Sequence, residues 1–394
     1  MWSDGAAMTE GDGVDGAAEE DVSDEAAVGA RELFDRYGAR THRAVLRAIP
    51  SGEPHRYLYD LLPIYLLRPS KYLRPVLCLA ACAAFGGIAE DAMPVAVALE
   101  LIHTAFLVHD DIQDQSPYRR GGPALPVSYG TPLALNVGDM LASLASDQLI
   151  AAVERLPEPV AAEVLHEYQR VVRQTIEGQA MELGWQHDNT PDVTTADYLN
   201  MVMKKTSWYS TIAPLRLGAL IGSDGDADLG PLTRYGAYLG TMFQIANDLA
   251  GIGVPGHGGE DIREGKRTLP LIHLLDHGSR SDRQRLLAFL DLPRHQQRRE
   301  DINWVADTLY ASGSVDFGRS CLRAMTDIAR DQSRPACAEL PPSPDRDLLL
   351  AMPSILLSGD PLPSHTGRDS QLTVPSRHSS PTTSRWEATL PARP

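Results

Sequence analysis

The chain of 394 residues is poor in cysteine, lacks an excess of positive charge and contains no long uncharged apolar run. Its four cysteines form neither a CxxC pair nor a metal-ligand spacing, so we interpret them as small core residues in a reducing cytosol. The formal net charge is −16, which argues against a nucleic-acid partner because binding to a phosphate backbone requires a basic surface. Without a run of about 18 uncharged apolar residues, we expect no transmembrane segment.

Both ends of the chain have a biased composition. Residues 1–28 carry nine Asp or Glu and no Lys or Arg, and residues 361–394 are mostly Ser, Thr, Pro and Arg. Such segments bury too little apolar surface to offset the entropy that the chain loses on folding. We therefore predict a disordered acidic tail at 1–28 and a disordered Ser/Pro/Thr-rich tail at 361–394, on either side of one domain at 29–360.

Between these tails, apolar residues recur at steps of three and four, as in VAVALELIHTAFLVHDD and LTRYGAYLGTMFQIANDLAGI. Alternating strand-like runs are nearly absent, and Gly and Pro cluster between the helical windows. The pattern predicts an all-α domain in which about ten helices pack as a single bundle.

The stretch VHDDIQDQSPYRR concentrates charge of both signs. Asp110 and Asp114 lie four residues apart and share one helix face, with Asp111 about 100° round. Carboxylates this close repel one another unless cations bridge them, and oxygen ligands without clustered His or Cys favour Mg²⁺. The guanidinium groups of Arg119 and Arg120 could each donate two hydrogen bonds to phosphate oxygens. We expect metal ions and arginines to neutralise a diphosphate here; a solvated helix end that carries three acids is the alternative.

Several motifs, in this order, resemble the all-trans polyprenyl diphosphate synthases, which include the farnesyl and geranylgeranyl diphosphate synthases. The motifs are SKYLRP, the DDxxD and RRG pair, GQAMEL, the KT pair, FQ, EDIREGKRTLP and LPPSPDRDLLLAM. The likeness runs over nearly all of residues 35–358. It implies an isoprenoid-synthase-type helical bundle around a central cavity, and a prenyltransferase that uses Mg²⁺ and works as a homodimer in the cytoplasm.

The resemblance implies a head-to-tail prenyl transfer between two diphosphates. An allylic diphosphate would bind through Mg²⁺, and isopentenyl diphosphate would bind in a separate cationic pocket. The implied catalytic residues are Asp110, Asp114, Lys205, Thr206 and Gln244. The implied substrate-binding residues are Lys71, Arg74, His103, Arg119, Arg120, Lys205 and Lys266. The implied metal ligands are Asp110, Asp111, Asp114, Asn247 and Asp248.

The second aspartate-rich motif departs from the family's pattern. The family carries FQxxDDxxD, whereas this chain reads FQIANDLAG, so Asn247, Asp248 and Gly251 stand in the places of three acids. An amide oxygen can ligate a cation but adds no charge, and glycine adds nothing. The loop that follows is shorter than in the family and has His257 where the family has a phosphate-binding lysine. Loss of a few ionic contacts could slow ionisation by orders of magnitude.

Three explanations of this departure remain open. In the first, Asn247 and Asp248 still hold the remaining Mg²⁺, and the enzyme makes a linear prenyl diphosphate. In the second, the fold serves terpene cyclisation or prenyl transfer to a different acceptor. In the third, the chain is a non-catalytic or regulatory subunit of a prenyl synthase. The complete set of residues for isopentenyl diphosphate favours the first explanation.

The residues one turn before the first aspartates bear on product length. In the family's fold the growing prenyl tail passes below these aspartates, so side chains there act as a floor. Phe106 is large and Ala105 is small, and one bulky ring predicts a stop at C15 to C20, that is, at farnesyl or geranylgeranyl diphosphate. An ordinary core role for Phe106 is the alternative.

Overall fold

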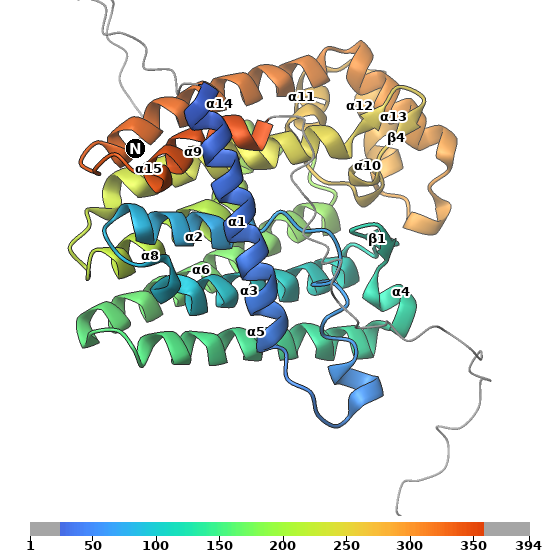
Figure 1. Ribbon diagram of the computed structural model, residues 1–394. Helices are drawn as coiled ribbons and strands as arrows, with labels where there is room; N and C mark the ends of the chain where they lie inside the picture. Colours follow the sequence, from blue (N-terminus) through green and yellow to red (C-terminus); the bar gives the residue numbers. More distant parts are fainter. Residues whose placement is uncertain (1–23, 358–394) are drawn as a thin grey trace, which may run out of the picture.

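The structure is a computed structural model that describes residues 24–357 (Figure 1). The prediction of an all-α fold is confirmed, because the described residues contain fifteen α-helices and four two-residue strands. This is more than the ten or so helices expected, partly because two of them, α4 and α10, have only five residues. The tail predicted at 361–394 and most of the tail predicted at 1–28 lie outside the described residues, but the first helix begins at Asp24, inside the latter.

The elements follow one another along the chain with short connections. The α-helices are α1 (Asp24–Ala48), α2 (Leu73–Ala84), α3 (Met93–Gln113), α4 (Leu125–Tyr129), α5 (Thr131–Val153), α6 (Glu158–His187), α7 (Thr195–Val202), α8 (Ala213–Gly222), α9 (Leu229–Gly251), α10 (Glu260–Glu264), α11 (Leu269–His277), α12 (Arg280–Leu290), α13 (Arg299–Ala311), α14 (Ser314–Cys337) and α15 (Pro344–Leu357). The other elements are π-helices η1 (His55–Tyr59) and η3 (Met203–Ile212), 3₁₀-helices η2 (Ala89–Ala92) and η4 (Arg294–Gln296), and strands β1 (Tyr118–Arg119), β2 (Gly122–Pro123), β3 (Gly253–Val254) and β4 (His257–Gly258).

Helix boundaries follow local chemistry. Helices α3, α5 and α6 each have a proline in the first turn, where the missing N–H costs nothing and the ring sets a helical φ. Helix α7 begins with a capping box, in which Thr194 and Asp197 each accept from the other's backbone N–H. Asp228 caps α9 by accepting from the N–H of Gly230 at 2.9 Å. These signals are local, so the helix starts can be read from the chain.

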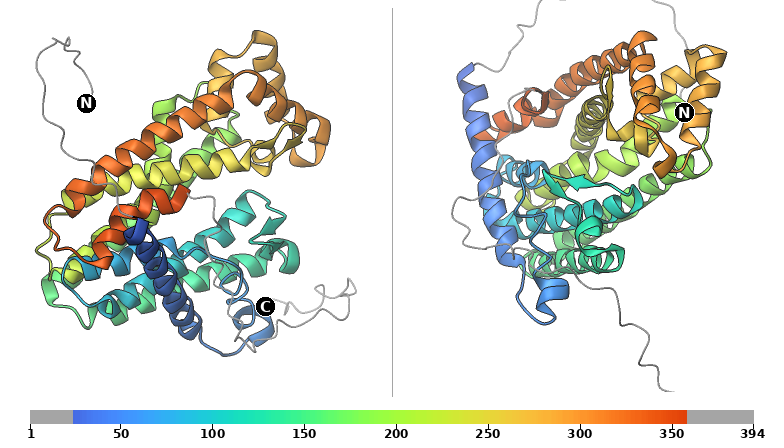
Figure 2. Two further views of the ribbon diagram at one scale, coloured as in Figure 1. Left: turned by 45° about the horizontal axis from the view of Figure 1, so that its top comes forward. Right: turned by 90° about the vertical axis from the view of Figure 1, so that its right-hand side faces the viewer.

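The long helices form a bundle with α3 inside it. Figure 1 shows α3, α5 and α6 running side by side, with α1 crossing them, and α1 also packs on α2 and α15. Every residue of α3 from Val95 to Ala105 is buried, and eight of these eleven residues are apolar, as expected of a helix inside a bundle. Helices α10 to α13 surround a second, smaller core at one end of the bundle (Figure 2).

One segment of the described chain, Ala89–Gln113, is long and apolar enough to cross a membrane. It contains α3, and 72% of its most apolar window is buried inside the protein. The main core of the bundle therefore accounts for the apolar character of this segment.

Candidate active site

A cavity of about 950 Å³ opens among α3, α6, η3 and α9. Its apolar lining includes Ile102, Phe106, Val172, Tyr209 and Phe243. Of the residues predicted from the sequence, most line it: Lys71, Arg74, His103, Phe106, Asp110, Arg119, Arg120, Lys205, Thr206, Gln244, Asn247, Asp248 and Lys266. The fold thus gathers into one cavity residues that lie far apart along the chain.

Asp110 faces this cavity from the last turn of α3. Lys205 Nζ lies 3.7 Å from its Oδ1, Arg119 Nη2 lies 3.2 Å from its Oδ2, and Gln179 donates to it at 3.3 Å. Burial opposes the charged form of Asp110, but Lys205, Lys266 and Arg119 outweigh it and hold the pKa of this carboxyl below its ordinary value. Asp110 is therefore ionised at neutral pH and is available to a cation.

Asp114 caps the same helix, is more deeply enclosed and is not part of the cavity lining. Its side chain is 1% exposed, and Lys266 Nζ lies 3.3 Å from Oδ2. Neither carboxylate oxygen accepts a hydrogen bond from any residue in the range 24–357. Burial, reinforced by the neighbouring Asp110 charge, raises the pKa of Asp114 to about 7. A buried carboxylate with cation contacts and no hydrogen-bond donors has the chemistry of a metal ligand.

Asp111 lies apart from the other two acids of the first aspartate-rich motif. It is fully buried and is not part of the cavity lining. Tyr65 Oη donates to its Oδ2 at 2.5 Å, and Arg119 Nε donates to its Oδ1 at 2.7 Å. The structure therefore places Asp111 behind the site, where it orients Arg119, because its helix position turns it away from the other two acids.

The two arginines are held by a tight hairpin between β1 and β2. Its two turn residues, Arg120 and Gly121, have φ values of 49° and 77°, the left-handed geometry that suits the twist of a two-residue hairpin. Arg68 Nη1 donates to the carbonyl of Arg119 at 2.7 Å. The hairpin sends the adjacent side chains to different partners: Arg119 to the acidic cluster and Arg120 to His103.

A cationic pocket forms one wall of the cavity. Arg120 Nη2 donates to His103 Nε2 at 3.4 Å, and Arg74 donates to Ser210 Oγ at 2.8 Å. The buried counter-charge is Glu100, which is 1% exposed and lies 3.9 Å from Arg120. The exposed Lys71 ammonium lies 5.9 Å from the centre of the Phe243 ring. This pocket presents several donors to an anion.

His103 is neutral in this pocket. Burial, and then the charges of Arg74 and Arg120, lower its pKa well below the ordinary value. Because an arginine can only donate, Nε2 accepts from Arg120 and the ring proton resides on Nδ1. Nδ1 is buried and has no hydrogen-bond partner in the described chain. His103 therefore offers one unpaired N–H donor without adding a charge.

The π-helix η3 supplies the opposite wall. Its residues Lys205, Thr206 and Tyr209 line the cavity. Lys205 pairs with Glu182 of α6, and Thr206 Oγ1 donates to Gln244 Oε1 at 2.8 Å. Burial opposes the charge on Lys205, but Glu182 and Asp110 prevail and raise its pKa. Lys205 thus remains cationic.

The second aspartate-rich motif contributes one buried acid from α9. Asp248 accepts from Tyr198 Oη at 2.7 Å and from Gln244 Nε2 at 2.6 Å. Burial, and then the charge of Asp261, raise the pKa of Asp248 to about 7. Asn247 lies one residue earlier, exposed at the cavity lining.

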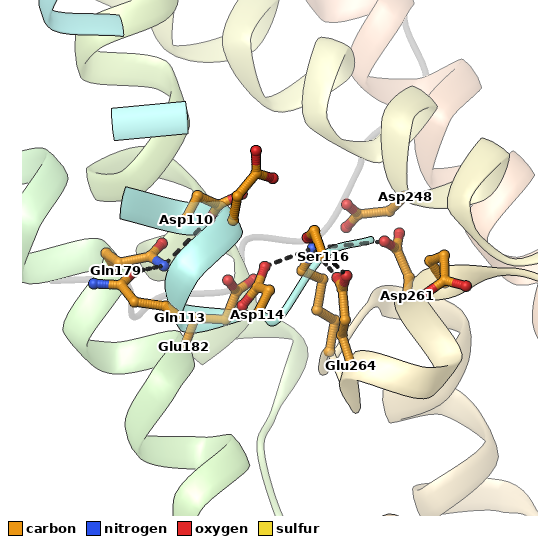
Figure 3. Close-up of polar contacts among 12 residues, drawn as sticks. Asp110, Gln113, Asp114, Ser116, Gln179, Glu182, Asp248, Asp261 and Glu264 are labelled. Carbon is orange, nitrogen blue, oxygen red and sulfur yellow. Dashed lines mark hydrogen bonds and ion pairs between the residues drawn. The ribbon is translucent and has the colours of Figure 1, made fainter. Parts of the chain in front are cut away.

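Lysines lie between the acids on the two sides of the site. Lys266 Nζ lies 3.3 Å from Asp114, 3.6 Å from Asp261 and 2.6 Å from Glu264. Within residues 24–357 no three His, Cys, Asp or Glu side chains are already arranged to hold a metal ion. Figure 3 shows Asp110, Asp114 and Glu182 on one side and Asp248 and Asp261 on the other. The acids therefore fit divalent cations chemically, but such cations would compete with the lysines for them.

Phe106, the predicted floor residue, lines the cavity together with Tyr209, to which the sequence assigned no role. The Phe106 ring packs edge-on against Tyr209 with 6.0 Å between ring centres. Ala105 is 1% exposed, belongs to the main core and is not part of the cavity lining. Successive helix residues point about 100° apart, so only one of the two can face the cavity.

Glu100, Tyr209 and Asp261 were not assigned a role from the sequence. Glu100 and Tyr209 lie within ordinary helical patterns, and no local signal marks them. Asp261 stands inside the EDIREGKRTLP motif, so its charge beside Lys266 was a usable signal. His257, noted in place of a lysine, is exposed on β4 and is not part of the cavity lining.

Residues 55–309 match the family model described as polyprenyl synthetase. The chain is 36% identical over 246 residues to the short chain isoprenyl diphosphate synthase of Methanothermobacter thermautotrophicus, covering 59% of this chain and 73% of that protein. It is 30% identical over 295 residues to the octaprenyl diphosphate synthase of Escherichia coli, covering 74% and 86%. Among solved structures, a geranylgeranyl pyrophosphate synthetase from Pyrococcus horikoshii has a TM-score of 0.72 at 29% identity, covering 85% of this chain and 99% of that one.

Proposed function

Because the chain belongs to the polyprenyl synthetase family, whose members are prenyltransferases, we propose that it condenses isopentenyl diphosphate with an allylic diphosphate in an Mg²⁺-dependent reaction. The proposed product is an all-trans prenyl diphosphate of C15 to C20. We further propose that the enzyme acts as a homodimer in the cytoplasm.

The observation that carries this proposal is the presence of two separate charged sites in one cavity. Asp110 and Asp248 line this cavity, and the enclosed Asp114 lies 3.3 Å from Lys266, which also lines it. These three acids would form a site suited to metal ions and, through them, to one diphosphate. Arg74, His103 and Arg120 form a cationic site suited to a second diphosphate. A reaction that joins two diphosphates requires both, whereas a cyclase acting on one diphosphate has no need of the second.

Mg²⁺ bound by the acids would stabilise the negative charge that develops on the departing pyrophosphate. Arg119, Lys205 and Lys266 line the same region and would pair with phosphate oxygens. Thr206 and Gln244 present oxygen dipoles beside the cavity, where they would stabilise an allylic cation. The apolar lining would exclude water from that cation.

The bond changes balance within the two substrates. The allylic C–O bond breaks and its electron pair leaves with pyrophosphate. The double bond of isopentenyl diphosphate then attacks the allylic carbon and forms the new C–C bond. A proton leaves the adjacent carbon of the isopentenyl unit for a pyrophosphate oxygen, which regenerates a double bond.

The test is to incubate the purified chain with Mg²⁺, isopentenyl diphosphate and C5, C10 or C15 allylic diphosphates, and to extract products before and after phosphatase. We expect a C15 to C20 alcohol that appears only after phosphatase. Replacement of both Asp110 and Asp114 by alanine should lower the rate by about 10²-fold or more. A hydrocarbon formed without phosphatase would favour cyclisation, and no product from the wild type would favour the regulatory-subunit explanation.

A further inference from the structure

Gly251 stands where an acid of the second aspartate-rich motif would stand. It is the last residue of α9 and lies one helical turn after Asn247, on the same face. Gly251, Asn247 and Asp248 all line the cavity. A carboxylate at position 251 would therefore reach the metal side of the site.

The carboxyl group of Asp261 fills the space that this side chain would occupy. A Cβ atom placed on Gly251 would lie 1.8 Å from Asp261 Oδ2, 2.4 Å from its Cγ and 2.9 Å from its Oδ1. The three nearest atoms thus belong to one carboxylate, and Asp261 itself lines the cavity. The negative charge that position 251 lacks is therefore supplied at nearly the same place by the carboxylate of Asp261, which belongs to α10.

The short hairpin after α9 makes this substitution possible. Strands β3 and β4 turn the chain back so that α10 begins beside the end of α9. The N–H of Gly259 donates to the carbonyl of Ile252 at 2.7 Å, and a Cβ on Gly259 would lie 1.9 Å from the carbonyl oxygen of Gly251. Only glycine permits this approach of the two backbones, and the approach carries Asp261 to the site.

The surroundings of Asp261 point to a cation. Its carboxylate lies on the same side of the site as Asp248 (Figure 3). Lys266 Nζ lies 3.6 Å from Asp261 and 3.3 Å from Asp114. Independently, Asp114 is almost fully buried with two oxygens that accept no hydrogen bond in the described chain. One positive charge already spans the two carboxylates, and a divalent cation would compete for the same oxygens.

We propose that Asp261 serves as a metal-ligating carboxylate of the second half-site, in place of the acid that position 251 lacks. This inference rests on the proposed function, because that function requires metal on the α9 side. It accounts for how a chain with only Asp248 left in the motif can keep a second acid there.

The test measures metal binding rather than turnover. Binding of Mn²⁺ to the full-length chain, in the presence of inorganic pyrophosphate, is followed by the loss of the electron paramagnetic resonance signal of free Mn²⁺ beyond the loss that the same concentration of pyrophosphate causes without protein. We expect Asp261→Asn to weaken the binding of at least one ion by about tenfold or more. Asp276→Asn removes an exposed acid from α11 and should leave binding unchanged.

Gly251→Ala tests the same idea without changing any charge. Alanine is normally favourable in a helix, but here its Cβ must displace the Asp261 carboxylate. We expect binding to weaken about as much as in Asp261→Asn. The double variant Gly251→Asp with Asp261→Gly returns one acid to the vacated space, and we expect it to recover most of the lost affinity.

The outcomes separate this inference from the proposed function. If the wild type binds Mn²⁺ and Asp261→Asn and Gly251→Ala bind it equally well, the inference fails while the proposed function stands. If the wild type binds no Mn²⁺ with pyrophosphate, both fail. Thermal unfolding of each variant identifies any that do not fold. If Asp261→Asn does not fold, the metal binding of Gly251→Ala tests the inference instead.

Discussion

Asp114 and Asp248 are buried carboxyl groups whose pKa is raised to about 7, in each case mainly by burial. Between about pH 4 and pH 7 these carboxyl groups are protonated in the folded chain, whereas in the unfolded chain they have released their protons. The contribution of these groups to the free energy of unfolding therefore falls as the pH rises through this window and is lowest above pH 7. A bound divalent cation would offset this loss at neutral pH, where the carboxylates must be charged to ligate it.

Asp248→Asn removes one of these titrations while keeping a side chain that can pair with Gln244 and Tyr198. Without metal, we expect its melting temperature relative to the wild type to rise by a few degrees between about pH 5 and about pH 8. The measurement is thermal unfolding by circular dichroism across pH. Asp276→Asn, on an exposed acid, should show no such trend. A difference for Asp248→Asn that is the same at both ends of the range would contradict the prediction.

Phe106 is the large residue that lines the cavity one turn before Asp110. Phe106→Ala would remove a ring that packs on Tyr209 and would open space below the site. We expect products longer by one or more five-carbon units, measured by chromatography after phosphatase. Phe289→Leu, in the smaller core, serves as the control and should leave product length unchanged. An unaltered distribution for Phe106→Ala would remove Phe106 from the floor.

At the scale of elements, η3 and α6 meet more closely than ordinary helices do. Gly178 of α6 faces the backbone of Lys205, and a Cβ there would lie 2.2 Å from the Lys205 nitrogen. A backbone contact cannot yield as a flexible side chain can. The placement of Lys205 and Thr206 in the cavity therefore depends on a glycine in the neighbouring helix.

Gly178→Ala should push η3 away from α6 and misplace Lys205. We expect kcat to fall by about 10²-fold, since displacements of about 1 Å cost this much in other enzymes, together with a lower melting temperature. Gly184→Ala is the matched control, because it lies in the same helix with nothing within 4 Å of the added Cβ. The control should be as stable as the wild type or slightly more so. Equal activity of the two variants would count against this account of η3.

At the scale of the whole molecule, we propose that one helical domain carries the activity and that the terminal segments do not. Helix α1 begins at Asp24 and buries Ala30, Leu33 and Phe34 against the main core. Removal of residues 1–23 and 361–394 should therefore leave folding and metal binding intact. Removal of residues 1–34, which takes these core side chains as well, should lower the melting temperature markedly. Loss of folding in the shorter truncation would refute the proposal that the terminal segments are dispensable.

Product length is also decided at this scale. The relatives include both a short chain synthase and an octaprenyl synthase, so membership of the family leaves the length open. Phe106 of α3 packs on Tyr209 of η3, and we propose that the height of the cavity floor depends on how these two elements pack. The C15 to C20 proposal thus depends on the packing of the bundle as well as on one residue.

The sequence by itself determined the all-α class, the order of the motifs and thirteen of the residues that line the cavity. These follow from short-range rules: helical periodicity, capping and the spacing of Asp110 and Asp114 on one turn. The roles of Asp111 and Ala105 could not be read in this way, because helix rotation decides which residue of a neighbouring pair faces the cavity.

Only the tertiary structure decided that Asp261 fills the space beside Gly251, that Glu100 balances the cationic pocket and that Tyr209 meets Phe106. Each of these contacts joins segments that are distant along the chain, and nothing in the sequence indicates that they meet in space. Packing at close quarters creates them, since two backbones can meet at Gly251 and Gly259 only where no side chain intervenes.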